Sequence, residues 1–295
     1  MNALLTGNNG FFGKYIYNSF IKTHNIYTLS RSKSSYNVDL SKQIPHFNEP
    51  YDIVIHCAGK AHDLSKKTIK KNLIYKINVN GLKNLLSGLE KKIIPSKFVF
   101  ISSVSVYGLL SGINVSESND LLAKDEYGLS KIEGEKIVKE WCKDNHVKCL
   151  ILRLPLLIGQ NPPGNLGAMI KSIKKGYYFN INGGKARKSM VLADDVSEII
   201  LKASEIGGTF NLTDGNHPDF NQLGYSIAKQ LNKKYILNMP LFIAQLLSKI
   251  GDCMGLNLFN SFKLNKIVSD LTFDDSKARK TLDWKPNSVI DNIKI

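Results

Sequence analysis

Residues 2–13 read NALLTGNNGFFG, a short apolar run followed by a turn that contains three glycines. Asn2 to Leu5 has the pattern of a buried strand, and the run KYIYNSFIK after the last glycine has that of a helix. A strand that enters a helix through a glycine-rich turn brings backbone amides and the positive helix end together. This arrangement suits a bound pyrophosphate, although a glycine triplet alone also occurs in ordinary tight turns.

The three glycines have separate expected roles. Gly7 permits the turn, Gly10 lets the backbone approach a phosphate, and Gly13 allows the helix to pack closely on the strand. Their spacing is GxxGxxG, which departs from the GxGxxG of the general dinucleotide fingerprint. Because the turn stands at the first strand-to-helix junction, we expect it to bind a dinucleotide, with Phe11 and Phe12 beside the ligand.

The end of the next predicted strand, Asn25 to Leu29, bears on the choice of dinucleotide. An acidic residue there would bind the ribose hydroxyls of NAD, whereas an arginine suits the 2′-phosphate of NADP. The chain has Arg31 and Ser32 at this place, which favours NADP and leaves NAD as the alternative. In the plainer interpretation Arg31 is an exposed loop residue. Asp39-Leu40 follows, where the carboxylate could accept a hydrogen bond from the adenine amine.

Two later segments have the composition of central strands in a parallel sheet. Residues 52–59, DIVIHCAG, end in small residues, as is required where backbone passes close to a flat ligand. Residues 97–108, KFVFISSVSVYG, end in hydroxyl side chains. Ligands of such sheets bind beyond the carboxyl ends of the strands. The candidates to hydrogen-bond a substrate oxygen are therefore Ser102, Ser103 and Ser105, although serine at a strand end is more often a turn former.

Residues 127–144, YGLSKIEGEKIVKEWCKD, predict a helix. Its apolar residues recur at about helical spacing, namely Leu129, Ile132, Ile137 and Trp141. Tyr127 and Lys131 are four residues apart and project from one face. An ammonium near the phenol would lower its pKa from about 10 towards neutrality, as a proton shuttle needs. Such pairs also occur by chance in surface helices, so this pair gains its weight from the other motifs.

Together the motifs resemble the extended short-chain dehydrogenase/reductases, in particular those that act on nucleotide sugars. The matching segments are TGNNGFFG, HCAG, ISSVSVYG and YGLSK, in this order, and the resemblance runs from Asn2 to about Pro286. It implies an α/β fold, a Rossmann-like doubly wound parallel sheet with a smaller, mostly C-terminal α/β substrate lobe. We expect residues 1–158 and about 190–214 to bind the dinucleotide, and about 159–189 and 215–295 to form the interleaved substrate lobe.

The resemblance also implies roles for individual residues. Ser103 matches the catalytic serine, Tyr127 the proton donor or acceptor, and Lys131 its partner, which also holds the nicotinamide ribose. The expected cofactor-binding residues are Gly7, Gly10, Phe11, Phe12, Gly13, Arg31, Ser32, Asp39, Leu40, Ala58, Gly59, Asn78, Tyr127, Lys131 and Pro155. The expected substrate-binding residues are Lys60, Ser103, Ser105, Asn165, Leu166, Arg187 and Lys188. Either Arg187 or Lys188 would contact the diphosphate of the substrate.

Composition sets the outer limits. The 295 residues, 43% of them hydrophobic and 22% charged, are enough to bury a substantial core. The formal charge of +15 suits an anionic ligand, a nucleic acid or an anionic membrane surface. We do not expect nucleic-acid binding, because no array of aromatic and basic residues stands out and lysine pairs are typical of solvated helix faces. The pairs are Lys66-Lys67, Lys70-Lys71 and Lys174-Lys175.

Other sequence features favour a metal-free cytoplasmic enzyme. The four cysteines show no CxxC pattern and the six histidines no paired ligand spacing, so neither disulfides nor a metal site is expected. No apolar run has transmembrane length, and the first strand begins at Asn2. Residues 240–256 are amphipathic, and we expect them to pack on the substrate lobe rather than to touch a membrane. The family further implies a homodimer through a four-helix contact.

Reduction, epimerisation and a non-catalytic role stay open. Dehydration is disfavoured because the related 4,6-dehydratases carry an acidic pair where this chain has Val104 and Ser105. Arg31 favours an exchangeable NADPH and thus a reductase. The segments HCAGKAH and KSMVLADDV resemble those of enzymes that reduce a 4-keto-6-deoxy-hexosamine nucleotide in bacterial surface-polysaccharide synthesis, which implies reduction at C4. The alternative is a 4-epimerase of UDP-sugars such as UDP-glucose or UDP-N-acetylglucosamine, with a retained NAD. An NADP-binding sensor or scaffold without turnover is the alternative of another class.

Overall fold

A parallel β-sheet of seven strands forms the centre of the protein in this computed structural model, which describes residues 1–61, 72–92, 94–255 and 259–295. The strands are β1 (Asn2–Thr6), β2 (Asn25–Ser30), β3 (Tyr36–Asn37), β4 (Ile53–His56), β5 (Lys97–Ser103), β7 (Lys148–Leu154) and β11 (Gly208–Asn211). Their spatial order is β11-β7-β5-β4-β1-β2-β3. The order reverses between β1 and β4, so the doubly wound sheet is confirmed. Sheets of this kind bind ligands beyond the carboxyl ends of the strands at such a reversal.

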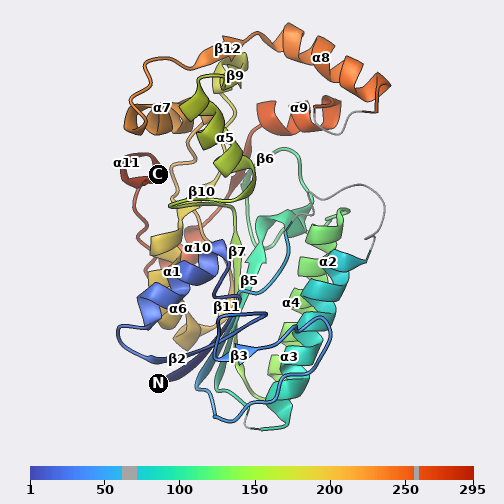
Figure 1. The fold of residues 1–295 in the computed structure, drawn as a ribbon, viewed down its shortest axis with the longest axis vertical. Helices are drawn as coiled ribbons and strands as arrows, with labels where there is room; N and C mark the ends of the chain where they lie inside the picture. The colour runs from blue at the N-terminus through green and yellow to red at the C-terminus, as the bar shows by residue number, and fades with distance from the viewer. Residues whose placement is uncertain (62–71, 93, 256–258) are drawn as a thin grey trace.

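Helices cover both faces of this sheet (Figure 1). One face carries α1 (Phe11–Phe20), α6 (Ala193–Ile206) and α10 (Ser276–Leu282). The other carries α2 (Leu73–Tyr75), the π-helical turn η1 (Lys76–Asn80), α3 (Gly81–Glu90) and α4 (Glu126–Asp144). A separate apolar core fills each interface, as continuous Val, Ile and Leu runs in the strands require. The predicted lysine pairs at residues 66–67 and 70–71 lie outside the described residues.

The prediction of which side of α4 is buried is partly wrong. Leu129 is 50% exposed, whereas Lys131 and Glu135 are buried against the sheet. The remaining buried positions of the helix are mostly small or aromatic, namely Gly128, Ser130, Gly134, Val138, Trp141 and Cys142. The helix therefore buries charged groups, which is stable only where they are paired or hydrogen-bonded.

The substrate lobe lies beyond the carboxyl edge of the sheet (Figure 1). Its helices are α5 (Gly164–Lys175), α7 (Phe220–Gln230), α8 (Leu241–Cys253), α9 (Ser261–Val268) and α11 (Val289–Asn292). Three short parallel pairs join them: β8 (Leu156–Ile158) with β10 (Met190–Leu192), β9 (Phe179–Ile181) with β12 (Leu237–Met239), and β6 (Gly112–Val115) with β13 (Leu271–Phe273). We expected all of 215–295 in this lobe, but Ala278, Leu282 and Trp284 pack in the core on the α1 and α6 face. The exact division of the chain stays a proposal.

Helix α8 packs on the lobe through its small side chains. Its buried residues are Ala244, Ser248 and Gly251, and most of its large apolar side chains are exposed. Small side chains allow α8 to approach α9 closely, so the side of α8 that carries them is buried and the side with leucines and isoleucines is not. No described helix is long and apolar enough to cross a membrane. Leu256, the last residue of the predicted amphipathic segment, lies outside the described residues.

Candidate active site at the carboxyl edge of the sheet

The glycine-rich turn lies at the carboxyl end of β1, and two of its glycines are sterically required. Gly7 has a φ of +79°, and a Cβ there would lie 2.7 Å from the Ala58 nitrogen. A Cβ on Gly13 would lie 2.1 Å from the Gly7 carbonyl oxygen, so this glycine lets α1 pack against the turn. A Cβ on Gly10 would meet the same oxygen at 3.2 Å, a much milder contact.

Helix α1 begins directly after Gly10, three residues earlier than predicted. No side chain among the described residues caps it. The Phe12 side chain is buried in the core, and the Phe11 ring packs edge-on against Tyr15 at 5.5 Å between centroids. The first turn of α1 thus offers main-chain amides to a ligand, while the Phe12 side chain belongs to the packing.

The loop after β2 is attached to the glycine-rich turn. Asn9 Nδ2 donates to Ser30 Oγ at 2.8 Å and to the Ser32 carbonyl at 2.6 Å. Arg31 is exposed beside Asp39, whose pKa is lowered first by the Ser41 hydroxyl and to a smaller extent by Lys42 and Arg31. The Leu40 side chain is buried in the core, so any contact it makes with a ligand is through the main chain.

Asn78 ties the loop after β4 to α4. Its Oδ1 accepts from the Lys60 nitrogen at 2.8 Å, and its Nδ2 donates to the Lys60 carbonyl at 3.1 Å and to Ser130 Oγ at 2.9 Å. The residue lies in η1, and single π-helical turns are frequent at functional sites. Asn78 thus holds the Lys60 backbone beside α4. A Cβ on the preceding Gly59 would lie 3.6 Å from Lys131 Nζ.

Ser103, Ser105 and Tyr127 form one hydrogen-bonded group at the end of β5. Ser103 Oγ donates to Ser105 Oγ at 3.1 Å and accepts from the Ser105 nitrogen at 3.1 Å. The Tyr127 hydroxyl hydrogen-bonds to Ser103. Ser102 is different, because its hydroxyl points to the other side of the strand and donates to Glu135 at 2.6 Å. The expectation that Ser102 faces a substrate is therefore wrong, as the alternation of side chains along a strand explains.

Lys131 lies behind Tyr127 and does not lower the pKa of its phenol. Its Nζ donates to the Ile101 carbonyl at 2.7 Å and lies 5.9 Å from the centre of the Tyr127 ring. Burial raises the pKa of Tyr127 to about 12, and burial lowers the pKa of Lys131 to about 8. Removal from water outweighs the attraction we had expected, because the ammonium is held on a backbone oxygen instead of the phenol.

A buried ion pair under Lys131 is the part of the site that the sequence analysis missed. Arg153 makes two bonds to Glu135, from Nε at 3.0 Å and from Nη2 at 2.7 Å. Its Nη1 donates to the Tyr107 hydroxyl at 3.0 Å, which in turn donates to Asn211 Oδ1 at 2.8 Å. The signal in the sequence was an arginine inside the apolar strand LILRL, since a cation there needs a buried acidic partner.

On the substrate side, the structure separates the two candidate cations. Arg187 is exposed and lines a cavity of about 290 Å³. Its Nε and Nη2 donate to the carbonyls of His217 and Asn216 at 3.3 and 3.2 Å. Lys188 instead donates to the Lys266 and Ser269 carbonyls at 2.9 and 2.7 Å. Burial lowers the pKa of Lys188 to about 8. Arg187 is therefore placed to meet a ligand, and Lys188 holds two segments of the lobe together.

Asn165 and Leu166 lie in the first turn of α5 and point in different directions. Asn165 is exposed, whereas the Leu166 side chain is buried in the lobe core. A contact from Leu166 to a substrate would therefore use its main chain. Pro155 is partly exposed at the junction of β7 and β8, next to the carboxyl edge of the sheet.

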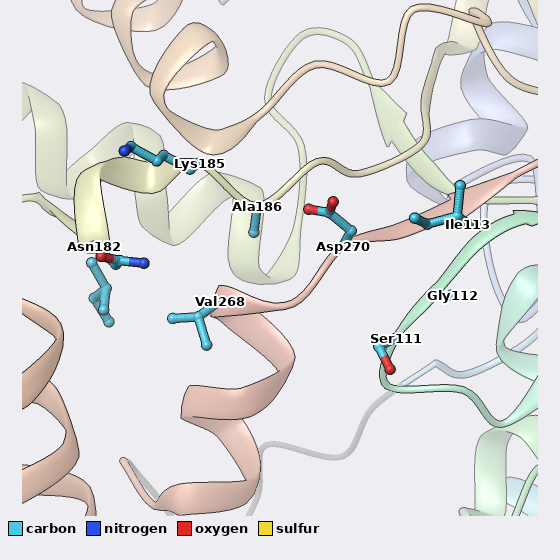
Figure 2. Close-up of a pocket in the computed structure, with 9 residues that line it drawn as sticks. Ser111, Gly112, Ile113, Asn182, Lys185, Ala186, Val268 and Asp270 are labelled. Carbon is cyan, nitrogen blue, oxygen red and sulfur yellow. The ribbon is translucent and has the colours of Figure 1, made fainter.

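A larger cavity of about 580 Å³ opens between β6, β9 and the segment before β13 (Figure 2). Lys185 and Asp270 are its charged lining residues, and Ile113 and Asp270 also line the Arg187 cavity. The two cavities are thus neighbours in the lobe and do not include Tyr127 or Lys131. In the part of the chain that the structure describes, no three His, Cys, Asp or Glu residues are grouped so that they could hold a metal ion.

Comparison with known proteins gives a consistent picture. The model of the NAD dependent epimerase/dehydratase family matches residues 3–212. A UDP-glucose 4-epimerase of Vibrio cholerae is 25% identical over 98% of this chain and 92% of its own. The N-acetyl-alpha-D-glucosaminyl-diphospho-ditrans,octacis-undecaprenol 4-epimerase of Escherichia coli O157:H7 is 29% identical over 95% and 89%. A dTDP-4-dehydro-6-deoxyglucose reductase of Escherichia coli is 26% identical over 98% and 94%.

Solved structures share the fold. The UDP-glucose 4-epimerase of Thermotoga maritima, solved with UDP-glucose, superposes with a TM-score of 0.73 at 20% identity, over 99% of this chain and 96% of its own. RMD from Pseudomonas aeruginosa, solved with NADPH, superposes with a TM-score of 0.72 at 19% identity, over 98% and 94%. At these identities the likeness concerns the fold, including the part of the lobe beyond residue 212, which the family model does not cover.

Proposed function

Because the chain belongs to the NAD-dependent epimerase/dehydratase family, we propose that it reduces a 4-keto-6-deoxy-hexosamine nucleotide at C4 with NADPH. The observation that carries this proposal is the hydrogen-bonded pair Ser103 and Tyr127, with the Lys131 ammonium one helical turn away. These groups lie at the carboxyl edge of a doubly wound sheet, beside the glycine-rich turn. When bound there, a nicotinamide would supply the hydride.

The side chains can perform the proton half of such a reaction. Ser103 and Tyr127 would both hydrogen-bond the keto oxygen and orient it. Since burial raises the pKa of Tyr127 to about 12, its phenol is protonated near neutral pH. It is thus ready to give its proton to the oxygen that becomes an alkoxide. Lys131, held by Ile101, keeps a positive charge close to that oxygen.

The binding of NADPH would use groups with different chemistry at its two ends. The main-chain amides after Gly10 suit the pyrophosphate, and the exposed Arg31 suits a 2′-phosphate. Arg187, which lines the lobe cavity, would contact the diphosphate of the substrate. Titration with NADPH and NADH tests this choice, and a tighter complex with NADH would contradict it.

A 4-epimerase is the second candidate, because two of the curated relatives are 4-epimerases. Such an enzyme would keep its NAD and would first take a proton from a sugar hydroxyl at Tyr127. One of these relatives is named for UDP-glucose and the other for a sugar on an undecaprenol diphosphate. The alternative that we expected acts on a UDP-sugar, and a polyprenol diphosphate is the other carrier that these names bring in. A homodimer and a cytoplasmic location stay predictions.

One experiment separates these functions. The purified protein is denatured, and any nucleotide that it retained is identified by mass. Native protein is then incubated in two mixtures. The first contains a 4-keto-6-deoxy nucleotide sugar and NADPH, and the second contains UDP-N-acetylglucosamine and no added cofactor. We expect NADPH consumption in the first mixture only. Rapid C4 epimerisation in the second would reverse our order. The Tyr127→Phe variant should lose nearly all turnover and keep its affinity for NADPH, whereas a sensor would show no turnover to lose.

A further inference from the structure

Helix α8 carries a continuous apolar surface on its exposed side. Successive residues of a helix are about 100° apart round its axis, so the apolar side chains between Phe242 and Leu247 cover about 140° of the circumference. The buried residues Ala244, Ser248 and Gly251 lie on the opposite side. Phe242, Leu246 and Met254 are 70%, 61% and 67% exposed. The other large apolar residues of this arc are Ile243, Leu247 and Ile250. We call these six residues the α8 arc.

Helix α8, which carries the arc, lies at one end of the long axis of the molecule (Figure 1). The paired strands β9 and β12 lie beside α8 at the same end, with Phe179 opposite Leu237 in their register. Both side chains are exposed, and Tyr235 just before β12 is 84% exposed. Exposed apolar surface of this extent is unusual on a protein that stands alone in water and marks a binding surface.

Positive charge surrounds this apolar end. Residues 159–189 and 215–270, which build this lobe, contain twelve lysines and arginines and only three acidic residues. Lys174 and Lys175 end α5, and Lys233 and Lys234 follow α7; all four are exposed. Lys249 borders the arc on α8 itself. An apolar helix face bordered by Lys249, on a lobe with further exposed lysines and an exposed tyrosine, matches what an interface with anionic lipid headgroups selects.

We propose that the α8 arc docks the protein on the surface of an anionic lipid bilayer. The helix would lie in the plane of the headgroups with Phe242, Leu246 and Ile250 among the acyl chains, and the lysines would face the headgroup phosphates. The lobe would then lie between the lipid and the seven-stranded sheet (Figure 1). A second copy of the chain fits this end less well, because two such lobes would bring like charges together.

Vesicle binding tests the proposal without any substrate and so independently of the proposed reaction. Purified full-length protein is sedimented with vesicles of phosphatidylcholine containing phosphatidylglycerol, and with vesicles of phosphatidylcholine alone. We expect binding to the mixed vesicles, reduced at least about fivefold on neutral vesicles or in high salt. The variant Leu246→Glu/Ile250→Glu should bind the mixed vesicles about tenfold more weakly.

The matched control is Ile21→Glu/Ile206→Glu, which adds the same charge at two exposed isoleucines outside the lobe. It should bind the mixed vesicles like the unchanged protein, and both variants should keep the same NADPH affinity if they are folded. Equal binding by the arc variant and the control would overturn the proposal, as would no binding by the unchanged protein. The last measurement is sedimentation velocity without lipid. If the unchanged protein and the control are dimers and the arc variant is a monomer, the lipid proposal is overturned, because the α8 arc is then an interface between two copies of the chain.

Discussion

At the scale of single residues, the site is defined by what burial does to Tyr127 and Lys131. Burial moves the two pKa values in opposite directions, to about 12 and about 8, because each side chain is shifted towards its neutral form. A neutral phenol suits a proton donor. A buried ammonium is costly, and the protein offsets the cost only in part through the Ile101 carbonyl and the Phe100 ring, 4.9 Å away.

We therefore expect Lys131→Met to stabilise the protein while it abolishes turnover. In the folded protein Lys131 has a pKa of about 8, below the value of about 10.4 of an unfolded chain. Between these values the unfolded chain binds more protons, so the stability of the unchanged protein rises with pH. The variant should be more stable at pH 7 by about 1–3 kcal/mol, and the difference should vanish towards pH 10.5.

Urea unfolding at several pH values measures this difference. Lys136→Met is the matched control, because Lys136 lies on the exposed side of the same helix α4. It should change the free energy of unfolding by less than about 0.5 kcal/mol at every pH. A Lys131→Met protein that is less stable at pH 7, or whose advantage does not depend on pH, would contradict the argument.

At the scale of elements, the junction of β1 and α1 was predictable because its determinants are local. The strand pattern, the turn and the helix follow one another within residues 2–20, and backbone sterics alone assign Gly7 and Gly13 their places. The structure adds the difference between the glycines, since a Cβ on Gly13 meets Gly7 at 2.1 Å and one on Gly10 at 3.2 Å.

This difference predicts that one alanine variant loses mainly stability and the other mainly affinity for NADPH. Gly13→Ala should force α1 away from the turn and lower the free energy of unfolding by about 1–3 kcal/mol or more. Gly10→Ala should cost less than about 1 kcal/mol, because its φ of −72° suits alanine. Its methyl group would nevertheless lie beside the expected phosphate, so NADPH affinity should fall about tenfold. Thermal unfolding and NADPH titration of both variants check this, and equal stabilities would contradict it.

The packing of α4 could not be predicted in the same way, because its determinants come from distant strands. The sequence placed Leu129 on the buried face, and the structure buries Lys131 and Glu135 instead. A prediction from helical periodicity assigns leucine to the buried side in preference to charged residues. It cannot show that Arg153 on β7 and Ser102 on β5 will be partners of Glu135. Only the fold brings those partners to Glu135.

The Glu135 and Arg153 pair predicts a strong asymmetry between single and double variants. Arg153→Met leaves a buried carboxylate without its cation and should lower the free energy of unfolding by about 3–5 kcal/mol. Adding Glu135→Gln removes the uncompensated charge and should recover at least about 2 kcal/mol. Lys202→Met is the control, since its ion pair with Asp283 is exposed and its loss should leave the stability nearly unchanged. Additive effects in chemical unfolding would refute the coupling.

At the scale of the whole molecule, the sequence predicted the fold class and left the lobe poorly determined. The sheet follows from largely apolar strands, most of them separated by helices, which permits few topologies. The lobe is built from short pairs such as β8 with β10 and β9 with β12, whose partners are distant in the chain. Its cavities, and the side of α8 that is buried, therefore emerge only from the assembled structure.

The charge of the whole molecule predicts how catalysis should respond to salt. A formal charge of +15 attracts NADPH and a nucleotide sugar, both of them anions, over distances that salt shortens from about 10 Å at 0.1 M to about 3 Å at 1 M. Raising NaCl from about 50 to 500 mM should lower kcat/KM for both ligands about tenfold and leave kcat nearly unchanged.

NADH and sucrose are the controls for the effect of salt on kcat/KM. NADH lacks the 2′-phosphate, so its kcat/KM should fall less steeply with salt than that of NADPH if Arg31 and the surrounding field act on that phosphate. Sucrose of equal osmolality should have little effect, because it does not screen charge. Initial rates at saturating sugar measure each slope. Parallel slopes for the two cofactors would mean that the positive field is spread evenly and that Arg31 does not discriminate between them.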